Sequence, residues 1–589
     1  MEVTRLFDLP YNQLEQFPQS DAFADKVDGK WIKTSTQSYI DQANEISRGL
    51  IKLGIQPGDK IALISNNRTA WNICDIGIQQ VGAIGVPVYP TISADIYEYI
   101  FNDAGIKLCI VSDQELFDKV HSVQDKIPSL QAVYAFENVE GARSWEELKV
   151  APDEKLDAEI SLRKAAINYE DLVTLIYTSG TTGNPKGVML SHKNLLSNVV
   201  DCKPRLPVNQ EGKALSFLPV CHVYERMLLY LYQYTGVSVY FAESMETIGD
   251  NLREVKPNVF TAVPRLLEKV YDRIIAKGEE LSGIKKKLFF WAVSVGEEYD
   301  VKGTSGWYNF KLKIARKLIF SKWQEALGGN AQAIASGSAA LQPRLARVFL
   351  AAGIPVMEGY GLTETSPVIS VNCQEGNNVR IGTTGRVLDN VEVKIADDGE
   401  ILVKGPNVMM GYYNLPDKTA EAIDAEGWFH TGDIGEFVEG KFLKITDRKK
   451  EIFKTSGGKY IAPQVMENKF KESRFIEQIM VIGENQKMPA AFIVPAFEFI
   501  TNWAKIKNID LGDGSEKSIA QSKAVYERIQ KEVEKYNAGF GKWEQIKRFE
   551  LVDHVWTPET NELTPTLKPK RRILLANHKD LYDKIYGNQ

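Results

Sequence analysis

The sequence predicts an α/β protein built on a mostly parallel sheet with covering helices. Strand-like and helix-like patterns alternate through residues 1–170, which is typical of such a sheet. The apolar, β-branched run Leu172–Ile176 then breaks into the glycine- and hydroxyl-rich stretch Tyr177–Gly187, as a buried strand does where it ends at the ligand-binding edge of a sheet. At 589 residues the chain is too long for one core, so we expect about three or four compact units.

The first strands and helices can be assigned from their patterns. Lys60–Ser65 is predicted as a buried strand and Thr69–Gly82 as a helix. Gly85–Val88 and Leu108–Val111 are predicted as further strands of the same sheet. No cluster of catalytic residue types occurs here, so we interpret this region as scaffold.

The stretch Tyr177–Gly187, with the sequence YTSGTTGNPKG, suits a polyphosphate ligand. Its glycines let backbone N–H groups approach an anion, its hydroxyls donate hydrogen bonds and its lysine adds a positive charge. It is not a Walker loop, because no Gly-Lys-Ser/Thr follows at the required spacing. The alternative is a surface linker, which seldom follows a buried strand directly. The candidate phosphate-binding residues are Thr178, Ser179, Gly180, Thr181, Thr182, Gly183 and Lys186.

Composition narrows the class of protein. The net charge of −6 argues against a nucleic-acid-binding surface. The five cysteines are scattered and form no C-x-x-C pair, a pattern that fits a reducing cytosol without disulfides or structural zinc. The amino terminus has no signal-peptide pattern, and no stretch approaches the ~18 apolar residues of a membrane span. We therefore expect a cytoplasmic protein that at most contacts a membrane peripherally, on its inner face.

A histidine lies in the motif Leu218–Arg226, LPVCHVYER, which follows a predicted helix at Ser191–Val200. His222 stands four residues before Arg226, a spacing that places an imidazole and a guanidinium on one face at the start of a helix. A lone histidine beside apolar residues is more often a hydrogen-bonded core residue than a catalytic or ligand-binding residue. Both interpretations stay open at this point.

Residues 281–323 combine basic and aromatic side chains at helical spacing, an arrangement that suits an anionic membrane surface. The alternative is a pair of helices that bury their aromatic rings and solvate their lysines. The basic residues are Lys285, Lys286, Lys287, Lys311, Lys313, Arg316, Lys317 and Lys322, and the aromatic residues are Phe289, Phe290, Trp291, Trp307, Tyr308, Phe310, Phe320 and Trp323.

Three short clusters carry further candidate groups. Ser336–Leu341 follows a strand-like run, and its small residues would let a flat ring approach the backbone. Tyr360–Thr365 supplies a carboxylate and hydroxyls, the oxygen ligands that a hard cation prefers. His430–Asp433 adds a carboxylate suited to a ribose diol. Each cluster also has a structural explanation, since Thr-Glu-Thr is common in helix caps and Gly-Asp in turns.

A domain boundary is predicted within Ile445–Lys454, where charges crowd a short link before the glycine-rich Thr455–Tyr460. Beyond the link, strand-like runs at Ile479–Ile482 and Ala491–Val494 accompany charged helical patterns. Near the end, Lys568 closes the sequence LTPTLK. A domain movement could carry this lysine into a distant phosphate site, although a lysine in a basic tail is ordinarily a solvated surface residue.

Together these motifs resemble a known family. YTSGTTGNPKG, YGLTET, HTGDIG, TDRKKEIFKTSGGKY and LTPTLK occur in the order of the adenylate-forming superfamily of acyl-CoA synthetases, luciferases and peptide-synthetase adenylation domains, and Thr431–Glu467 resembles the signature of long-chain fatty acid CoA ligases. The resemblance covers nearly the whole chain. It implies a large amino-terminal region of two α/β subdomains plus a β-barrel-like subdomain (residues 1–446), a hinge linker (447–454) and a small, mobile α+β carboxyl-terminal domain (455–589).

The resemblance also implies a two-step reaction. A long-chain fatty acid and MgATP would give an acyl adenylate and pyrophosphate, and the thiol of coenzyme A would then displace AMP. By match to the family motifs, Thr178–Lys186 would hold the β- and γ-phosphates, Glu364 with Thr178 the Mg²⁺, and Thr363 the α-phosphate. By the same match, adenine would be flanked by Gly337, Ser338 and Tyr360, with Gly361 beside them, and ribose would be held by Asp433 and Arg448. The second step would use Ser456, Gly457 and Gly458. Lys568 would be the adenylation lysine, and Lys450 would be the hinge.

The residue types assigned by the resemblance suit the chemistry of both steps. A carboxylic acid is ionised at neutral pH, so the first step needs alignment of two anions and neutralisation of phosphate charge rather than a general base. A thiol with a pKa of about 8.5 must then approach the same carbonyl from another direction. Rotation about Lys450 would withdraw Lys568 and bring Ser456–Tyr460 toward the adenylate. In this setting His222 becomes a candidate positioning group near the carboxylate.

Two positions depart from the family pattern. The usual glycine before the catalytic lysine is Leu567 here, which puts the geometry of that loop in question. The aromatic residue that gates the fatty-acid tunnel in some bacterial relatives would fall at Arg226, so no aromatic gate is predicted there.

Alternative functions remain. A peptide-synthetase module would need a carrier domain after Lys568, and we expect none. A medium-chain or aryl-CoA ligase would share the core motifs. A non-catalytic nucleotide- or acyl-binding protein would be expected to lack Lys568, Glu364 or Asp433, and all three are present. The sequence leaves open the preferred chain length and the oligomeric state, a homodimer being one option.

Overall fold

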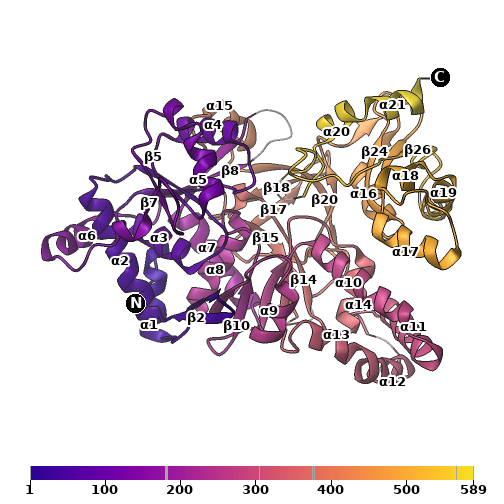
Figure 1. The fold of residues 1–589 in the computed structure, drawn as a ribbon, viewed down its shortest axis with the longest axis horizontal. Coiled ribbons are helices and arrows are strands. Elements are labelled where there is room, and N and C mark those ends of the chain that lie inside the picture. Colours follow the sequence, from indigo (N-terminus) through magenta and orange to yellow (C-terminus); the bar gives the residue numbers. More distant parts are fainter. Residues whose placement is uncertain are drawn as a thin grey trace. The chain divides into compact units, whose positions relative to one another are not determined.

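The computed structural model describes residues 2–178, 184–303, 305–374, 376, 378–564 and 567–587. The chain forms two compact units, the first from residues 1–394, 402–430 and 438–443 and the second from residues 395–401, 431–437 and 444–589 (Figure 1). Large sheets fill the first unit and a smaller α+β region the second, so the predicted mixed α/β class is confirmed. Strands β17 (Glu392–Ile395), β18 (Glu400–Lys404), β20 (Phe429–Val438) and β21 (Phe442–Arg448) have residues in both units.

One sheet of the first unit has eight strands in the order β19-β9-β8-β4-β3-β5-β6-β7. The strands from β8 to β7 in this order run parallel, whereas β9 is antiparallel to β8 and β19 is antiparallel to β9. The strands are β3 (Lys60–Ile64), β4 (Ile84–Pro87), β5 (Ile106–Val111), β6 (Ala132–Ala135), β7 (Arg143–Ser144), β8 (Leu172–Thr178), β9 (Lys186–Ser191) and β19 (Gly411–Tyr412).

The sequence patterns of this sheet are confirmed. The runs predicted as strands form β3, β4, β5 and β8, and the predicted helix from Thr69 forms α3 (Thr69–Gln80). Helix α7 (His192–Cys202) begins where predicted, because Ser191 Oγ accepts from Asn194 N–H while Asn194 Oδ1 accepts from Ser191 N–H. Further helices of this region are α1 (Leu9–Gln16), α2 (Thr36–Lys52), α4 (Ala94–Ala104), α5 (Gln114–His121) and α6 (Glu154–Ala166).

The second sheet of the first unit contains a run of nine strands in the order β16-β15-β14-β13-β12-β10-β11-β1-β2. Its central strands, from β14 to β1, run parallel, and their carboxyl ends therefore lie at one edge. The strands are β1 (Phe23–Val27), β2 (Lys30–Thr34), β10 (Lys213–Ser216), β11 (Ser238–Phe241), β12 (Val259–Ala262), β13 (Ala333–Ser336), β14 (Val356–Gly361), β15 (Val368–Val371) and β16 (Arg386–Val387).

The basic and aromatic segment forms helices that pack on this second sheet. Phe289, Tyr308, Phe320 and Trp323 are buried in the core that the segment shares with β12 and β13. The helices are α11 (Gly283–Glu297), α12 (Gly306–Ala315), a π-helical turn at Arg316–Phe320 and α13 (Ser321–Ala326), and their neighbours include α9 (Ile248–Val255), α10 (Pro264–Glu280) and α14 (Pro343–Ala351). Helix α8 (Val223–Thr235) packs against α1 and α7 instead. Among the described residues, no helix has the length and apolar character to cross a membrane.

The second unit has its own core around a three-stranded sheet in the order β24-β25-β26. Strand β25 (Ala490–Pro495) is antiparallel to β24 (Ile476–Ile482) and parallel to β26 (Arg548–Leu551). A separate two-stranded ribbon pairs β22 (Phe453–Lys454) with β23 (Tyr460–Ile461). The helices are α16 (Pro463–Phe470), α17 (Phe497–Lys507), α18 (Glu516–Gln521), α19 (Lys523–Asn537), α20 (Arg571–Asn577) and α21 (Lys579–Tyr586).

Candidate active site

The two ends of the predicted phosphate loop lie opposite one another. Thr178 at the end of β8 pairs with Lys186 at the start of β9, and Tyr177 pairs with Gly187. A Cβ at Gly187 would lie 3.0 Å from Cζ of the Tyr177 ring, so the glycine lets this ring pack against the strand. The predicted ligands Ser179, Gly180, Thr181, Thr182 and Gly183 lie outside the described residues.

Lys186 and Glu364 both contact the side chain of Tyr412. The Lys186 Nζ lies 3.8 Å from the centre of the Tyr412 ring, a cation–π contact, and Tyr412 OH donates a hydrogen bond to Glu364 Oε1 at 2.9 Å. Burial and the adjacent Glu364 carboxylate raise the pKa of Tyr412 far above its usual value, so the phenol keeps its proton. The first unit therefore brings a cation and a carboxylate together beside the phosphate loop.

The backbone around Glu364 is held from two directions. Met409 N donates to Glu364 O at 2.9 Å, and Thr365 Oγ1 donates to Pro367 O at 2.6 Å. Gly361 is required beside this turn, because a Cβ there would lie 1.7 Å from Pro367 O. Thr363 is buried in the same short 3₁₀ turn.

The residues predicted to flank adenine come from adjacent parallel strands. Ser336 at the end of β13 pairs with Glu358 of β14, so Gly337, which follows β13, and Tyr360, near the end of β14, lie at the same edge of the sheet. A Cβ at Gly337 would approach Cζ of the Tyr224 ring to 3.2 Å, which explains the need for a small residue. Ser338 adopts a left-handed conformation, with φ of 69°.

Two buried carboxyl groups near these strand ends were not singled out from the sequence. Glu358 accepts from Leu341 N at 3.3 Å, and burial raises the pKa of Glu358 to about 8. Glu225 accepts from Ser216 Oγ at 2.5 Å and Thr261 Oγ1 at 2.6 Å, and burial raises the pKa of Glu225 to about 7. An acidic residue within the apolar stretch Val356–Gly361 is the sequence signal that could have identified the first of them.

His222 caps helix α8. Its Nδ1 accepts from Tyr224 N–H at 3.1 Å, so the proton of the neutral imidazole resides on Nε2 and can be donated to an anion. The ring is half-buried and lies edge-on to Tyr89, with ring centres 6.5 Å apart. Glu225, which accepts hydrogen bonds from β10 and β12, fixes the first turn of the helix that His222 caps.

Arg226 does not share an exposed helix face with His222, as the spacing had suggested. The guanidinium is 1% exposed and is paired with Asp75, NH2 to Oδ1, at 2.5 Å. Its NH1 donates to Thr174 Oγ1 of β8 at 2.7 Å and its Nε to Tyr230 OH at 2.9 Å. Arg226 is therefore part of a buried network behind the phosphate-loop strand.

The second unit holds the pair predicted to bind ribose. Arg448 of β21 lies beside Asp433 of β20, with Nε 3.2 Å from Oδ1. Asp433 is buried, and its N–H donates to Thr431 Oγ1 at 3.1 Å. Burial also raises the pKa of the neighbouring Asp447 carboxyl to about 7.

Side-chain ion pairs hold the residues on both sides of the predicted hinge, Lys450. On one side, Lys449 Nζ contacts Asp398 at 2.6 Å and Glu400 at 2.8 Å. On the other, Glu451 accepts from Arg571 Nε at 3.1 Å. Lys450 between them is exposed, and its side chain has no recorded contact among the described residues.

The glycine-rich stretch after the hinge forms the turn between β22 and β23. Ser456 N donates to Gln486 O and Gly458 N to Thr455 O, each at 2.9 Å. Ser456, Gly457 and Gly458 are exposed, which leaves their backbone accessible.

Lys568 stands in a short hairpin. Thr564 N donates to Lys568 O at 2.8 Å, and Lys568 N donates to Thr564 Oγ1 at 3.0 Å. Leu567 has φ of 62°, the left-handed conformation that favours glycine. At the position where the family pattern has glycine, this chain therefore holds a leucine in a backbone conformation that glycine adopts more readily.

The chain is similar to known proteins in sequence and in fold. The sequence model of the AMP-binding enzyme family matches residues 11–413. The long-chain-fatty-acid–CoA ligase FadD15 of Mycobacterium bovis is 33% identical over 569 residues, which cover 96% of this chain and 94% of its own. Fatty acyl-CoA synthetase A of Dictyostelium discoideum is 32% identical, over 95% and 86% of the two chains.

A solved structure shares the fold. The adenylation domain of a carboxylate reductase from Mycobacterium chelonae superimposes with a TM-score of 0.77 at 21% identity, over 99% of this chain and 91% of that one. From the family match, the chain belongs to the AMP-binding enzymes. Within that family, the two relatives named above carry the names of a long-chain fatty acid ligase and a fatty acyl-CoA synthetase.

Proposed function

We propose that the protein activates a long-chain fatty acid to its acyl-CoA, through an acyl adenylate, with release of pyrophosphate and AMP. The observation that carries the proposal is the grouping of Lys186, Tyr412 and Glu364 beside the phosphate loop. The full-length similarity to long-chain fatty acid ligases supports the choice of substrate. ATP, Mg²⁺ and coenzyme A would be the co-substrates and cofactor.

In the first step the chain would align two anions and neutralise their charge. Lys186, Thr178 and the loop between them would hold the outer phosphates, and Glu364 with Thr178 would hold Mg²⁺, which neutralises phosphate charge when bound. The His222 Nε2–H, whose tautomer is fixed by Tyr224 N, would orient the fatty acid carboxylate.

The nucleoside would be held by the remaining candidates. Adenine would lie against the small residues after β13 and the Tyr360 ring, since a flat ring needs backbone without side chains on one face. The Asp433 carboxylate would accept from the ribose hydroxyls, and its contact with Arg448 at 3.2 Å would keep it oriented.

The second step would need a different arrangement of the same residues. Rotation about Lys450 would remove Lys568 and bring the exposed turn Ser456–Tyr460 to the adenylate, opening a path for the thiol of coenzyme A. The ion pairs of Lys449 and Glu451, on the two sides of Lys450, support this choice of hinge.

The test is ATP- and Mg²⁺-dependent acyl-CoA formation with saturated acids from about C4 to C20 and with benzoate. Because each buried CH₂ contributes about 0.8 kcal/mol, or about fourfold in affinity, we expect activity to climb with chain length to a maximum between about C12 and C18. Activity confined to short or aromatic acids would favour the medium-chain or aryl ligase. No adenylate and no thioester with any acid would favour a non-catalytic binding protein.

We also propose a peripheral contact with the anionic inner face of a membrane through residues 281–323. One face of α12 is buried, through Tyr308 and Leu312, yet the opposite face exposes Trp307 by 67% and Phe310 by 55%. Spacings of three and four residues continue this stripe to the half-buried Ile314 and the exposed Leu318. The segment carries nine Lys and Arg residues against three Asp and Glu, in a chain whose net charge is −6.

Removing the stripe should weaken binding to vesicles. The double variant Trp307→Ala/Phe310→Ala removes apolar area that would be buried in the membrane, and we expect it to lower the partition coefficient onto phosphatidylglycerol vesicles at least about 10-fold. The triple variant Lys285→Glu/Lys286→Glu/Lys287→Glu removes three basic residues worth about 1 kcal/mol each and should lower it at least about 100-fold in co-sedimentation. Ile506→Ala, a change of another exposed apolar residue, is the matched control. Co-sedimentation equal to that of the wild type in both variants would rule out this surface.

A further inference from the structure

Residues 562–564 and 567–570, here called the lysine hairpin, are joined by backbone hydrogen bonds. Lys570 N donates to Glu562 O at 2.8 Å, and nearer the turn Thr564 N donates to Lys568 O at 2.8 Å. The backbone position of Lys568 therefore follows that of Glu562. Pro565 and Thr566 lie outside the described residues.

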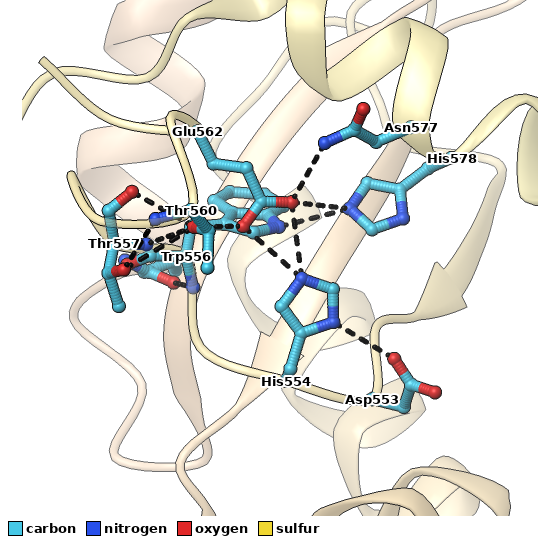
Figure 2. A network of polar contacts seen from close by, with 9 residues as sticks. Asp553, His554, Trp556, Thr557, Thr560, Glu562, Asn577 and His578 are labelled. Carbon is cyan, nitrogen blue, oxygen red and sulfur yellow. Dashed lines mark hydrogen bonds and ion pairs between the residues drawn. The ribbon is translucent and has the colours of Figure 1, made fainter. Parts of the chain in front are cut away.

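The Glu562 side chain fastens this hairpin to two other segments (Figure 2). The residue is 2% exposed. Its Oε1 lies 3.1 Å from His554 Nε2, in the loop after β26, and accepts from Asn577 Nδ2 at the end of α20 at 3.4 Å. Its Oε2 accepts from Thr560 Oγ1 at 2.7 Å. A single buried carboxylate thus joins the hairpin, the loop and the helix.

The surroundings shift the pKa values of the two histidines of this network in opposite directions. Burial disfavours the charged form of His554, but hydrogen bonds to Asp553 and Glu562 outweigh it and raise the pKa of His554. Burial lowers the pKa of His578, whose Nε2 accepts from Trp556 Nε1–H at 3.2 Å. The pKa shifts therefore favour the charged form of His554, beside Glu562, and the neutral form of His578.

Two histidines and a carboxylate also form a common donor set for transition metals, and the ligand atoms of His554, Glu562 and His578 lie within 4.8 Å of one another. The Trp556 N–H, however, occupies the lone pair of His578 Nε2, and His554 Nε2 is already engaged by the Glu562 carboxylate. The geometry favours a closed hydrogen-bond network over an ion site.

We propose that Glu562, held by His554, is a positioning residue for Lys568 in adenylation. The inference rests on the proposed function, in which Lys568 serves the first half-reaction and is withdrawn for the second. A lysine at the end of a flexible stem can align with a phosphate only if its backbone is fixed, and a misplacement of about 1 Å can cost about 100-fold in rate. The buried Glu562–His554 pair supplies that fixation from outside the hairpin.

The test compares Glu562→Gln and His554→Ala with the wild type in the full-length protein. Both variants lose the charge pair, so the hairpin should open more often. We expect ATP–pyrophosphate exchange to fall at least about 10-fold, while thioester formation from supplied acyl adenylate and coenzyme A stays within about twofold. Hydrogen–deuterium exchange of peptides covering residues 563–570 should become about 10-fold faster, because opening exposes the hydrogen-bonded amides.

Glu550→Gln is the matched control. It removes an ion pair of the same unit, Glu550 with Lys584 at 2.6 Å, that does not touch the hairpin, so both half-reactions and the exchange of residues 563–570 should match the wild type. Equal loss of both half-reactions in Glu562→Gln, or hairpin exchange unchanged from the wild type, would overturn the proposal. If the wild type shows no pyrophosphate exchange, the proposed function fails, and the amide-exchange comparison still decides whether Glu562 fixes the hairpin.

Discussion

Replacing Lys568 with alanine is expected to lower the rate of adenylate formation at least about 100-fold, the usual effect of removing one charge-stabilising donor from a transition state. In the proposed reaction, the lysine would bring its ammonium to the phosphate in the first step and would have no task in the second. Thioester formation from supplied acyl adenylate and coenzyme A should therefore stay close to the wild-type rate. The two half-reactions can be measured separately, by pyrophosphate exchange and by appearance of the thioester.

The neighbouring lysine provides the control for this variant. Lys570 stands on the same hairpin, and its Nζ contacts the side chain of Asn561. Lys570→Ala keeps the backbone N–H that closes the hairpin, so both half-reactions should proceed at wild-type rates. If Lys568→Ala slowed both half-reactions equally, the assignment of the lysine to one of two conformations would be wrong.

The largest loss of stability is expected from Arg226→Met. This substitution leaves the Asp75 carboxylate, which is 1% exposed, without its guanidinium partner. Breaking a buried ion pair from one side costs about 3–5 kcal/mol, because the remaining charge stays desolvated. The same change removes the donor to Thr174, which lies on the strand that leads into the phosphate loop. Urea unfolding followed by circular dichroism measures the free-energy difference.

Two further variants make this prediction specific. Arg226→Met combined with Asp75→Leu removes both charges and should recover most of the lost stability. Arg253→Met removes one member of the exposed pair Arg253–Asp250 and should cost no more than about 1 kcal/mol. A single Arg226→Met variant as stable as Arg253→Met would show that the buried pair contributes little.

Local patterns predicted much of the fold, because strands and helices depend mainly on residues that are neighbours in the sequence. The apolar run before Tyr177 forms β8, and the helix from Thr69 begins at the predicted residue. Periodicity cannot say which distant strand will pair with β9. Strand β19 does so through Tyr412, and the contact of this ring with Lys186 and Glu364 was therefore not foreseen.

The polar residues of the candidate site show the same limit. His222 was identified from its motif, but its role as the cap of α8 follows from backbone geometry. The spacing of four residues predicted a shared face for His222 and Arg226, whereas the burial of the guanidinium is decided by Asp75 on another helix. Charges inside a protein are placed by such long-range partners, so their surroundings cannot be derived from helical spacing alone.

The contacts on either side of Lys450 have a consequence for how freely the backbone can twist there. Arg448 is tied to Asp433, Lys449 to Glu400, and Glu451 to Arg571, so a change of torsion angle at any of these residues breaks an ion pair. The φ and ψ angles of Lys450 are the pair that can turn without this loss. Turning them costs the hydrogen bonds from Glu451 N and Ile452 N to Arg448 O, about 1 kcal/mol each, so a large reorientation would have a small local energy barrier.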